Sequence, residues 1–223
     1  MAISGAVFDC DGTLVDSMRM WFGIWEKLIE NHGVVPPEGL LLELEPLSLP
    51  DECDELHRRL GIGESGKALN DELHEMIRYE YTHNIQPFAG LRTFLESLRA
   101  AGIPMAIATS TSEAEVRLLL DHLGLEEFFC DVVCVERVGR QKDFPDVYLA
   151  ACESCGTPVE TTWVFEDVTF GLMTARKAGF PTVCIVNDHD GRDIEACRAC
   201  CDVLSHEYDD VSLELLQAFG TGE

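Results

Sequence analysis

The chain has 223 residues, of which 46% are hydrophobic, so it can form one large domain or a core with a smaller insertion. Its formal net charge of −25 argues against nucleic acid and anionic membrane surfaces as partners, because both favour a basic patch. No apolar run approaches the roughly 20 residues that a membrane-spanning helix requires.

The first predicted element is a strand, Ala2–Phe8, which leads into two aspartates, Asp9 and Asp11, and a glycine, Gly12. Residues i and i+2 of a strand point to the same face, so both carboxylates are expected to enter one crevice. Two aligned carboxylates can hold a hard cation, and one of them can also attack an electrophile. The pattern suggests Mg²⁺-assisted phosphoryl chemistry; the alternative is a strand followed by an ordinary Asp-Gly turn.

Residues 16–87 are predicted to form helices only. These helices are Asp16–Asn31, Asp51–Leu60 and Lys67–Tyr81. We expect residues 16–87 to be a helical cap domain inserted into an α/β core domain of residues 1–15 and 88–223. Such an insertion would cover the carboxyl edge of the sheet, where it could exclude water and select the substrate. The alternative is a packing subdomain without a gating role.

The rest of the chain alternates short apolar runs with helical patterns. The predicted strands are Ile103–Thr109, Asp131–Val135, Thr162–Phe165 and Thr182–Val186. The predicted helices are Leu91–Ala101, Ser112–Leu123, Pro145–Cys155 and Thr169–Ala178. This alternation predicts an α/β fold with a Rossmann-like, doubly wound parallel sheet.

Hydroxyl side chains stand at the end of the strand that finishes at Thr109, followed by Ser110. Hydroxyls beside a helix N-terminus suit a phosphate group. The alternative is a helix cap, because Ser112 with Glu115 three residues later resembles a capping box. Both interpretations hold together if Ser112 caps the helix and Thr109 faces the crevice.

Charged side chains occur at two later positions that are expected to lie near the same edge of the sheet. Lys142 precedes a helix that begins with proline and could neutralise a phosphoryl oxygen and a nucleophilic carboxylate, although a lone lysine is commonly a surface charge. Glu166 and Asp167 end the fourth strand, and could bind Mg²⁺ together with Asp9 and the backbone carbonyl of Asp11. Their alternative role is to complement a helix dipole.

The ten cysteines are expected to be reduced thiols of a cytoplasmic protein, and no signal peptide is expected before Asp9. Two CxxC pairs, Cys152–Cys155 and Cys197–Cys200, could bind zinc. Both pairs fall in helical patterns, which favours core packing over a zinc site.

The motifs occur in a characteristic order: DxDGT, a Thr/Ser strand end, a lysine, and Glu-Asp. The chain resembles hydrolases of the haloacid dehalogenase superfamily with an α-helical cap, in the phosphoglycolate phosphatase/β-phosphoglucomutase-like group. The resemblance covers residues 2–17 and 88–190, and in the cap it is only architectural.

The resemblance implies a role for each matched residue. Asp9 would be the nucleophile that becomes an aspartyl-phosphate, and Asp11 the general acid and then the general base. Thr109 and Lys142 would hold the transferring phosphoryl group. The implied Mg²⁺ site consists of Asp9, Asp11, Asp167 and Glu166. The substrate-binding candidates are Gly12, Ser110 and Arg19, the last chosen because it lies nearest the hinge into the cap.

Some positions depart from the family pattern. In β-phosphoglucomutases a histidine lies on the first cap helix, where this chain has Trp21. The segment matching the arginine-containing cap loop of the mutases, residues 46–50, has no arginine, and Val168 replaces the usual serine after Asp167. The two cap differences argue against mutase chemistry.

The predicted function is hydrolysis of a small phosphorylated metabolite, of the sugar phosphate or phosphoglycolate type, by a Mg²⁺-dependent phosphatase. It would be a monomer or weak homodimer. The alternatives are a β-phosphoglucomutase-like phosphomutase and a non-catalytic metabolite-binding protein on the same fold.

Overall fold

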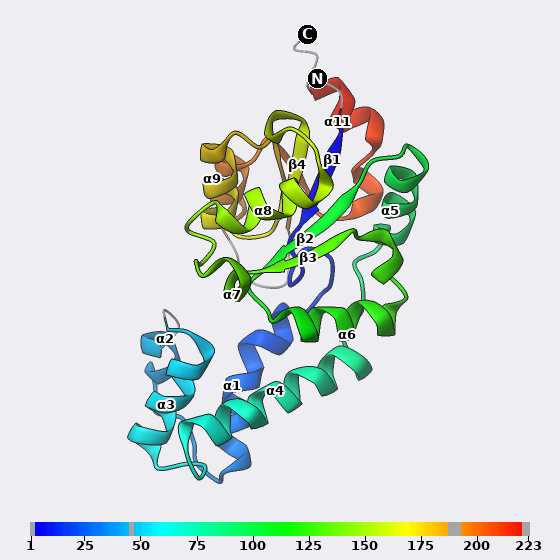
Figure 1. Ribbon diagram of the computed structural model, residues 1–223. Coiled ribbons are helices and arrows are strands. Elements are labelled where there is room, and N and C mark those ends of the chain that lie inside the picture. The colour runs from blue at the N-terminus through cyan, green and yellow to red at the C-terminus, as the bar shows by residue number, and fades with distance from the viewer. Residues whose placement is uncertain (1–2, 45–46, 187–192, 220–223) are drawn as a thin grey trace. The chain divides into compact units, whose positions relative to one another are not determined.

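The computed structural model describes residues 3–44, 47–186 and 193–219. The chain divides into two compact units (Figure 1). The core unit consists of Met1–Ser17 and Ile85–Glu223, and the helical unit of Met18–Asn84.

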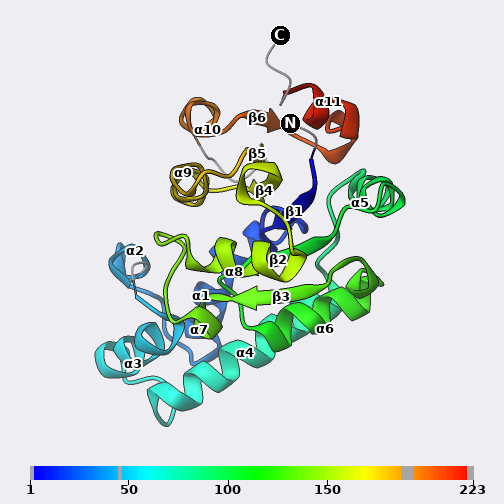
Figure 2. The ribbon, with the colours of Figure 1, turned by 45° about the horizontal axis from the view of Figure 1, so that its top comes forward.

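The core unit is built on one six-stranded parallel sheet. Its strands are β1 (Gly5–Phe8), β2 (Met105–Thr109), β3 (Asp131–Cys134), β4 (Thr162–Glu166), β5 (Thr182–Ile185) and β6 (Val203–Ser205). Their order is β3-β2-β1-β4-β5-β6, and every neighbouring pair is parallel (Figure 2). The strand order changes direction between β1 and β4, where α/β sheets of this type bind ligands at the carboxyl ends. The predicted Rossmann-like fold is confirmed.

Helices cover both faces of this sheet (Figure 2). On one face lie α8 (Asp146–Cys155) and α9 (Thr169–Ala178), and on the other lie α5 (Leu91–Ala100) and α6 (Glu113–Leu123). The smaller helices of the core unit are α7 (Val135–Val138), α10 (Ile194–Cys200), α11 (Leu213–Phe219), η1 (Glu126–Phe128), η2 (Val159–Thr161) and η3 (Tyr208–Asp210).

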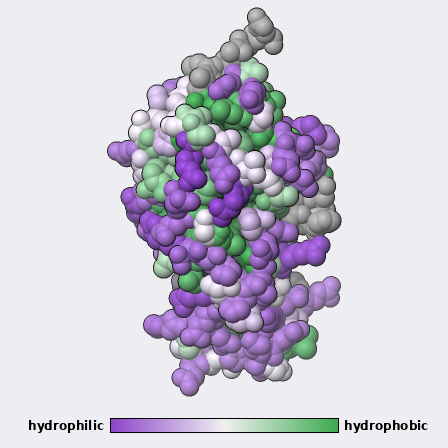
Figure 3. All heavy atoms as spheres, turned by 90° about the vertical axis from the view of Figure 1, so that its right-hand side faces the viewer, coloured by the Kyte–Doolittle hydropathy of each residue, from purple (hydrophilic) through white to green (hydrophobic). Residues whose placement is uncertain are grey.

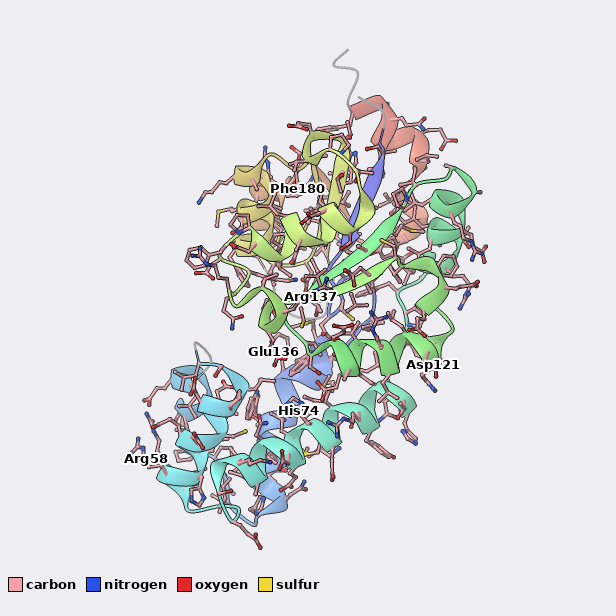
Figure 4. The ribbon with its side chains drawn as sticks, viewed as in Figure 1. Arg58, His74, Asp121, Glu136, Arg137 and Phe180 are labelled. Atoms are coloured by element: carbon pink, nitrogen blue, oxygen red, sulfur yellow. The ribbon has the colours of Figure 1, made fainter. Side chains whose placement is uncertain are left out.

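Alternating residues of β1 pack into two different cores. Val7 belongs to the cluster under α8 and α9, together with Val164 and Phe180, the last of which is labelled in Figure 4. Phe8 points to the opposite face, where its ring stacks on Phe165 with centroids 4.3 Å apart. Because side chains alternate along a strand, the residue after Phe8 is directed back to the face of α8 and α9.

The helical unit contains α1 (Met18–Asn31), α2 (Leu40–Leu44), α3 (Leu49–Leu60) and α4 (Gly66–His83). Ser65 caps α4 by accepting a hydrogen bond from the backbone N–H of Ala68. A Cβ atom at Gly66 would lie 2.6 Å from the Cα atom of Asp54, so glycine permits the close packing of α3 against α4. The face drawn in Figure 3 is mainly hydrophilic over this unit.

The unit boundaries differ from the predicted 15/16 and 87/88. Asp16 and Ser17 belong to the core unit, as do residues 85–87. The reason is that the two connecting segments pair with each other. The N–H of Asp16 donates to the carbonyl oxygen of Gln86 at 3.0 Å, and Val15 forms an antiparallel bridge with Pro87.

Both CxxC pairs lie in helices, as predicted: Cys152–Cys155 in α8 and Cys197–Cys200 in α10. Cys152 and Cys197 are buried within apolar clusters, which agrees with a packing role. Within residues 3–44, 47–186 and 193–219, no helix combines the length and apolar character needed to cross a membrane.

Candidate active site

Asp9 and Asp11 lie at the carboxyl end of β1, next to β4. The N–H of Asp9 donates to the carbonyl oxygen of Phe165 at 2.9 Å, so the backbone pairing continues one residue beyond the strand. The chain then turns at Gly12, whose φ of 78° favours glycine. The N–H of Gly12 donates to the carbonyl oxygen of Val15 at 2.9 Å, which closes the turn. The DxDGT segment therefore follows the end of β1 and turns at Gly12, so the strand and the Asp-Gly turn are both present.

Lys142 connects the ends of β1 and β4. Its Nζ atom donates one hydrogen bond to Oδ1 of Asp9 and another, of 2.6 Å, to Oε1 of Glu166. All three side chains are buried. Burial acts to lower the pKa of Lys142, but the negative charges of Asp9 and Glu166 outweigh it and hold this pKa above its usual value. The lysine therefore stays an ammonium ion.

The carboxyl group of Asp9 has a shifted pKa. Burial is the largest influence and raises it to about 7, while Lys142 acts in the opposite direction and Glu166 adds to the rise. Burial also acts to raise the pKa of Glu166, but the ammonium of Lys142 and the hydrogen bonds to Glu166 bring it below its usual value. Asp9 is thus a buried carboxylate whose ionised form would be stabilised by a second cation in addition to Lys142.

Three carboxylates form a compact cluster at this position. Asp9, Glu166 and Asp167 are all buried, and one oxygen atom from each lies within 4.8 Å of the others. Carboxylate oxygens are hard donors of the kind that Mg²⁺ prefers. The chemistry of the donor set therefore fits a small divalent cation.

Asp11 is held by two hydroxyl groups. Ser17 Oγ donates to its Oδ1 atom at 2.7 Å, and Thr111 Oγ1 donates to its Oδ2 atom at 2.8 Å. Thr111 in turn donates its backbone N–H to Oγ1 of Thr109 at 3.0 Å. The predicted residue Thr109 is thus buried at the end of β2 and joined to Asp11 through Thr111. Neither Thr111 nor the contact of Ser17 was expected from the sequence.

The hydroxyls that follow Thr109 are placed differently from one another. Ser110 is exposed at the end of β2. Ser112 is the N-cap of α6, since its Oγ accepts a hydrogen bond from the N–H of Glu115. The helix-cap interpretation of Ser112 is confirmed.

A buried tyrosine was also missed by sequence reasoning. Tyr148 of α8 donates its hydroxyl proton to Oε1 of Glu166 at 2.7 Å. Its position in an apolar helical pattern is typical of an ordinary core residue. Arg19, a substrate-binding candidate, lies on α1 of the helical unit.

Comparisons with known proteins agree with this architecture. The model of a family described as haloacid dehalogenase-like hydrolase matches residues 6–186. The chain is 26% identical to a phosphorylated carbohydrates phosphatase of Thermotoga maritima, over 96% of this chain and 100% of that protein. It is 31% identical to hexitol phosphatase A of Escherichia coli, over 83% and 84% of the two chains. A crystal structure of HAD hydrolase, family IA, variant 3 from Entamoeba histolytica shares the fold, with a TM-score of 0.82, 21% identity and coverage of 99% and 100%.

Proposed function

This chain belongs to the haloacid dehalogenase-like hydrolase family, and from that membership we propose that it is a Mg²⁺-dependent phosphatase of phosphorylated carbohydrates. The observation that carries the proposal is the bridge of Lys142 between Asp9 and Glu166, beside Asp167. A buried nucleophile, a fixed ammonium and a carboxylate cluster are the parts that phosphoryl transfer requires. The names of the matched relatives support a carbohydrate phosphate as the substrate.

Asp9, Asp167 and the backbone carbonyl of Asp11 would hold Mg²⁺, with Glu166 beside them. When bound, the ion would supply positive charge against the phosphoryl oxygens and help keep Asp9 ionised. This assignment is supported by the carboxylate cluster and by the raised pKa of Asp9.

In the first step, a carboxylate oxygen of Asp9 attacks the phosphorus atom, and the bond from phosphorus to the sugar oxygen breaks. Asp11 donates its proton to that leaving oxygen, which departs as an alcohol. The product is an aspartyl-phosphate on Asp9. Lys142 offsets the negative charge of the phosphoryl group during the transfer.

In the second step, water attacks the same phosphorus atom. Asp11, now ionised, accepts one proton from the water, and the bond from phosphorus to the Asp9 oxygen breaks. Inorganic phosphate leaves, and Asp9 returns to its carboxylate form with Asp11 protonated. The hydrogen bonds from Ser17 and Thr111 support this role by fixing both oxygens of Asp11.

We propose that the remaining phosphate contacts come from Gly12 in the turn after β1 and from Thr109 and Ser110 at the end of β2. The helical unit would act as a cap that selects the substrate, with Arg19 as one contact. The support for this is its point of insertion, since the unit begins at Met18, directly after the turn that follows Asp11. We also propose a cytoplasmic location, because all ten cysteines, each within the described residues, are free thiols.

The experiment is a phosphate-release assay on a panel of hexose, hexitol and pentose phosphates and phosphoglycolate. We expect release with Mg²⁺, none after chelation, and loss of activity in Asp9→Asn. The matched control is Asp121→Asn, an exposed residue on α6 (Figure 4), which should keep full activity.

Three results would contradict the proposal. Equal activity in the wild type and Asp9→Asn would exclude Asp9 as the nucleophile. Interconversion of glucose 1- and 6-phosphates without phosphate release would indicate a phosphomutase, and tight binding without turnover would indicate a non-catalytic protein.

A further inference from the structure

Glu166 receives four hydrogen bonds at the end of β4. Its Oε1 atom accepts from Lys142 Nζ at 2.6 Å and from the Tyr148 hydroxyl at 2.7 Å. Its Oε2 atom accepts from the N–H groups of Asp167 at 3.1 Å and Val168 at 3.4 Å. A carboxylate has about four lone-pair sites, so these donors account for its accepting capacity. The Glu166 carboxylate therefore holds these four donor groups in place.

Two of the four donors are side chains, Lys142 and Tyr148, and the proposed reaction gives a role only to Lys142. Its ring is fully buried in the apolar cluster beneath α8, which also contains Val7 and Val164. The ring centroid lies 5.7 Å from Nζ of Lys142. The hydroxyl is thus fixed by a rigid aromatic side chain and shares one carboxylate oxygen with the lysine ammonium.

A glycine of α9 leaves space for the hydrogen bond between Tyr148 and Glu166. Gly171 lies in the first turn of α9, where a Cβ atom would come within 2.7 Å of the Tyr148 hydroxyl and 2.8 Å of Oε1 of Glu166. A methyl group at this position would have to displace one of the two partners. Three elements of the fold, α8, β4 and α9, therefore meet at the hydrogen bond between Tyr148 and Glu166.

On the basis of the proposed function, we propose that Tyr148 is a positioning residue that acts through Glu166 to keep Lys142 against Asp9. The ammonium of Lys142 is shared between two buried carboxylates. The tyrosine hydroxyl neutralises part of the negative charge on Oε1 of Glu166, and this limits how strongly Glu166 attracts the lysine. Without the hydroxyl, Lys142 moves toward Glu166 and away from the nucleophile.

This account predicts a specific combination of effects for Tyr148→Phe. Loss of one hydrogen bond to a charged group should lower kcat by about tenfold, with little change in KM. Affinity for Mg²⁺ alone, measured by calorimetry without substrate, should stay the same or increase, because Asp9 is less neutralised by Lys142. A general loosening of the site would instead weaken Mg²⁺ binding together with kcat.

The control is Ser154→Ala, which removes a hydroxyl from the C-terminal turn of the same helix, where it donates to Asp131. This variant should lose some thermal stability and keep the wild-type kcat. Gly171→Ala perturbs the same hydrogen bond from α9 and should lower kcat as Tyr148→Phe does. Thermal unfolding of each variant establishes that it is folded.

The outcomes separate this inference from the proposed function. An active wild type with a tenfold lower kcat in Tyr148→Phe and undiminished Mg²⁺ affinity supports the inference. An active wild type with an unchanged Tyr148→Phe overturns the inference alone, as does a parallel loss of Mg²⁺ affinity and kcat. A wild type that releases no phosphate from any substrate overturns both.

Discussion

Lys142 donates a hydrogen bond to the carboxylate of Asp9, although 133 positions separate the two residues in the sequence. Both side chains are buried, and the same ammonium also binds Glu166. The contact places a permanent positive charge beside the proposed nucleophile, at the point where β1 and β4 meet.

Replacing Lys142 with methionine should lower kcat by about 10² to 10³-fold, because the charge of the phosphoryl group loses its fixed counterion. The free energy of unfolding should fall by about 3 kcal/mol, since two buried carboxylates lose their shared partner. Steady-state kinetics and urea unfolding measure both effects. Lys177→Met, an exposed lysine on α9, is the control and should change neither.

Two neighbouring hydroxyls should respond differently to mutation. Thr111→Val removes the hydrogen bond to Asp11 and should reduce kcat by about tenfold. Ser112→Ala removes the N-cap of α6 and should cost about 1 kcal/mol of stability with kcat unchanged. Kinetics and chemical denaturation of both variants test this. A normal kcat in Thr111→Val would show that Thr111 does not contribute to catalysis.

Asp131 should make stability depend on pH. Burial acts to raise its pKa, but hydrogen bonds from Ser154 and from Arg137, labelled in Figure 4, bring it below the ordinary value of 3.8. Its contribution is therefore present above pH 3.8 and is lost as the pH falls through the folded-state pKa.

At pH 7, Asp131→Asn should lower the free energy of unfolding by about 1 to 2 kcal/mol. The difference from the wild type should shrink as the pH falls below 3.8. Urea unfolding at several pH values measures this, and a pH-independent difference would show that charge is not the cause.

Two glycines of the helical unit should give opposite results on replacement by alanine. Gly66→Ala forces a methyl group against Asp54 and should destabilise the protein by about 1 to 3 kcal/mol. Gly23 lies in α1, and apart from its chain neighbours and the backbone of its own helix no described atom lies within 4 Å of its Cβ position, so Gly23→Ala should stabilise by about 0.5 to 1 kcal/mol. Thermal unfolding compares the two, and equal shifts would contradict the packing of α3 on α4.

The sequence predicts most of the core because local patterns determine it. The expected helix Thr169–Ala178 coincides with α9, and the strand expected at Thr162–Phe165 is β4, which extends to Glu166. The strand expected to reach Val135 ends at Cys134, because Val135 begins the short helix α7. The strand β6 and the helix α11 were not predicted, since both are short.

Only some residues of the candidate site are predictable from the sequence, and the difference between the two groups has a physical cause. Asp9 and Asp167 directly follow the strands β1 and β4, and parallel topology brings such strand ends together; Lys142 lies in the turn between α7 and α8. Thr111 and Tyr148 contact the site through pairing of segments distant in sequence, and each resembles an ordinary helix-cap or core residue in its local pattern. The roles of all five residues remain predictions until tested.

The most direct test of the central claim is to trap the covalent intermediate. The enzyme is quenched with acid during turnover with Mg²⁺ and a sugar phosphate, and its peptides are mapped by mass spectrometry. We expect one phosphoryl group on the peptide that contains Asp9, and none in Asp9→Asn. Turnover with a phosphoryl group on another residue, or undiminished turnover in Asp9→Asn, would contradict the account.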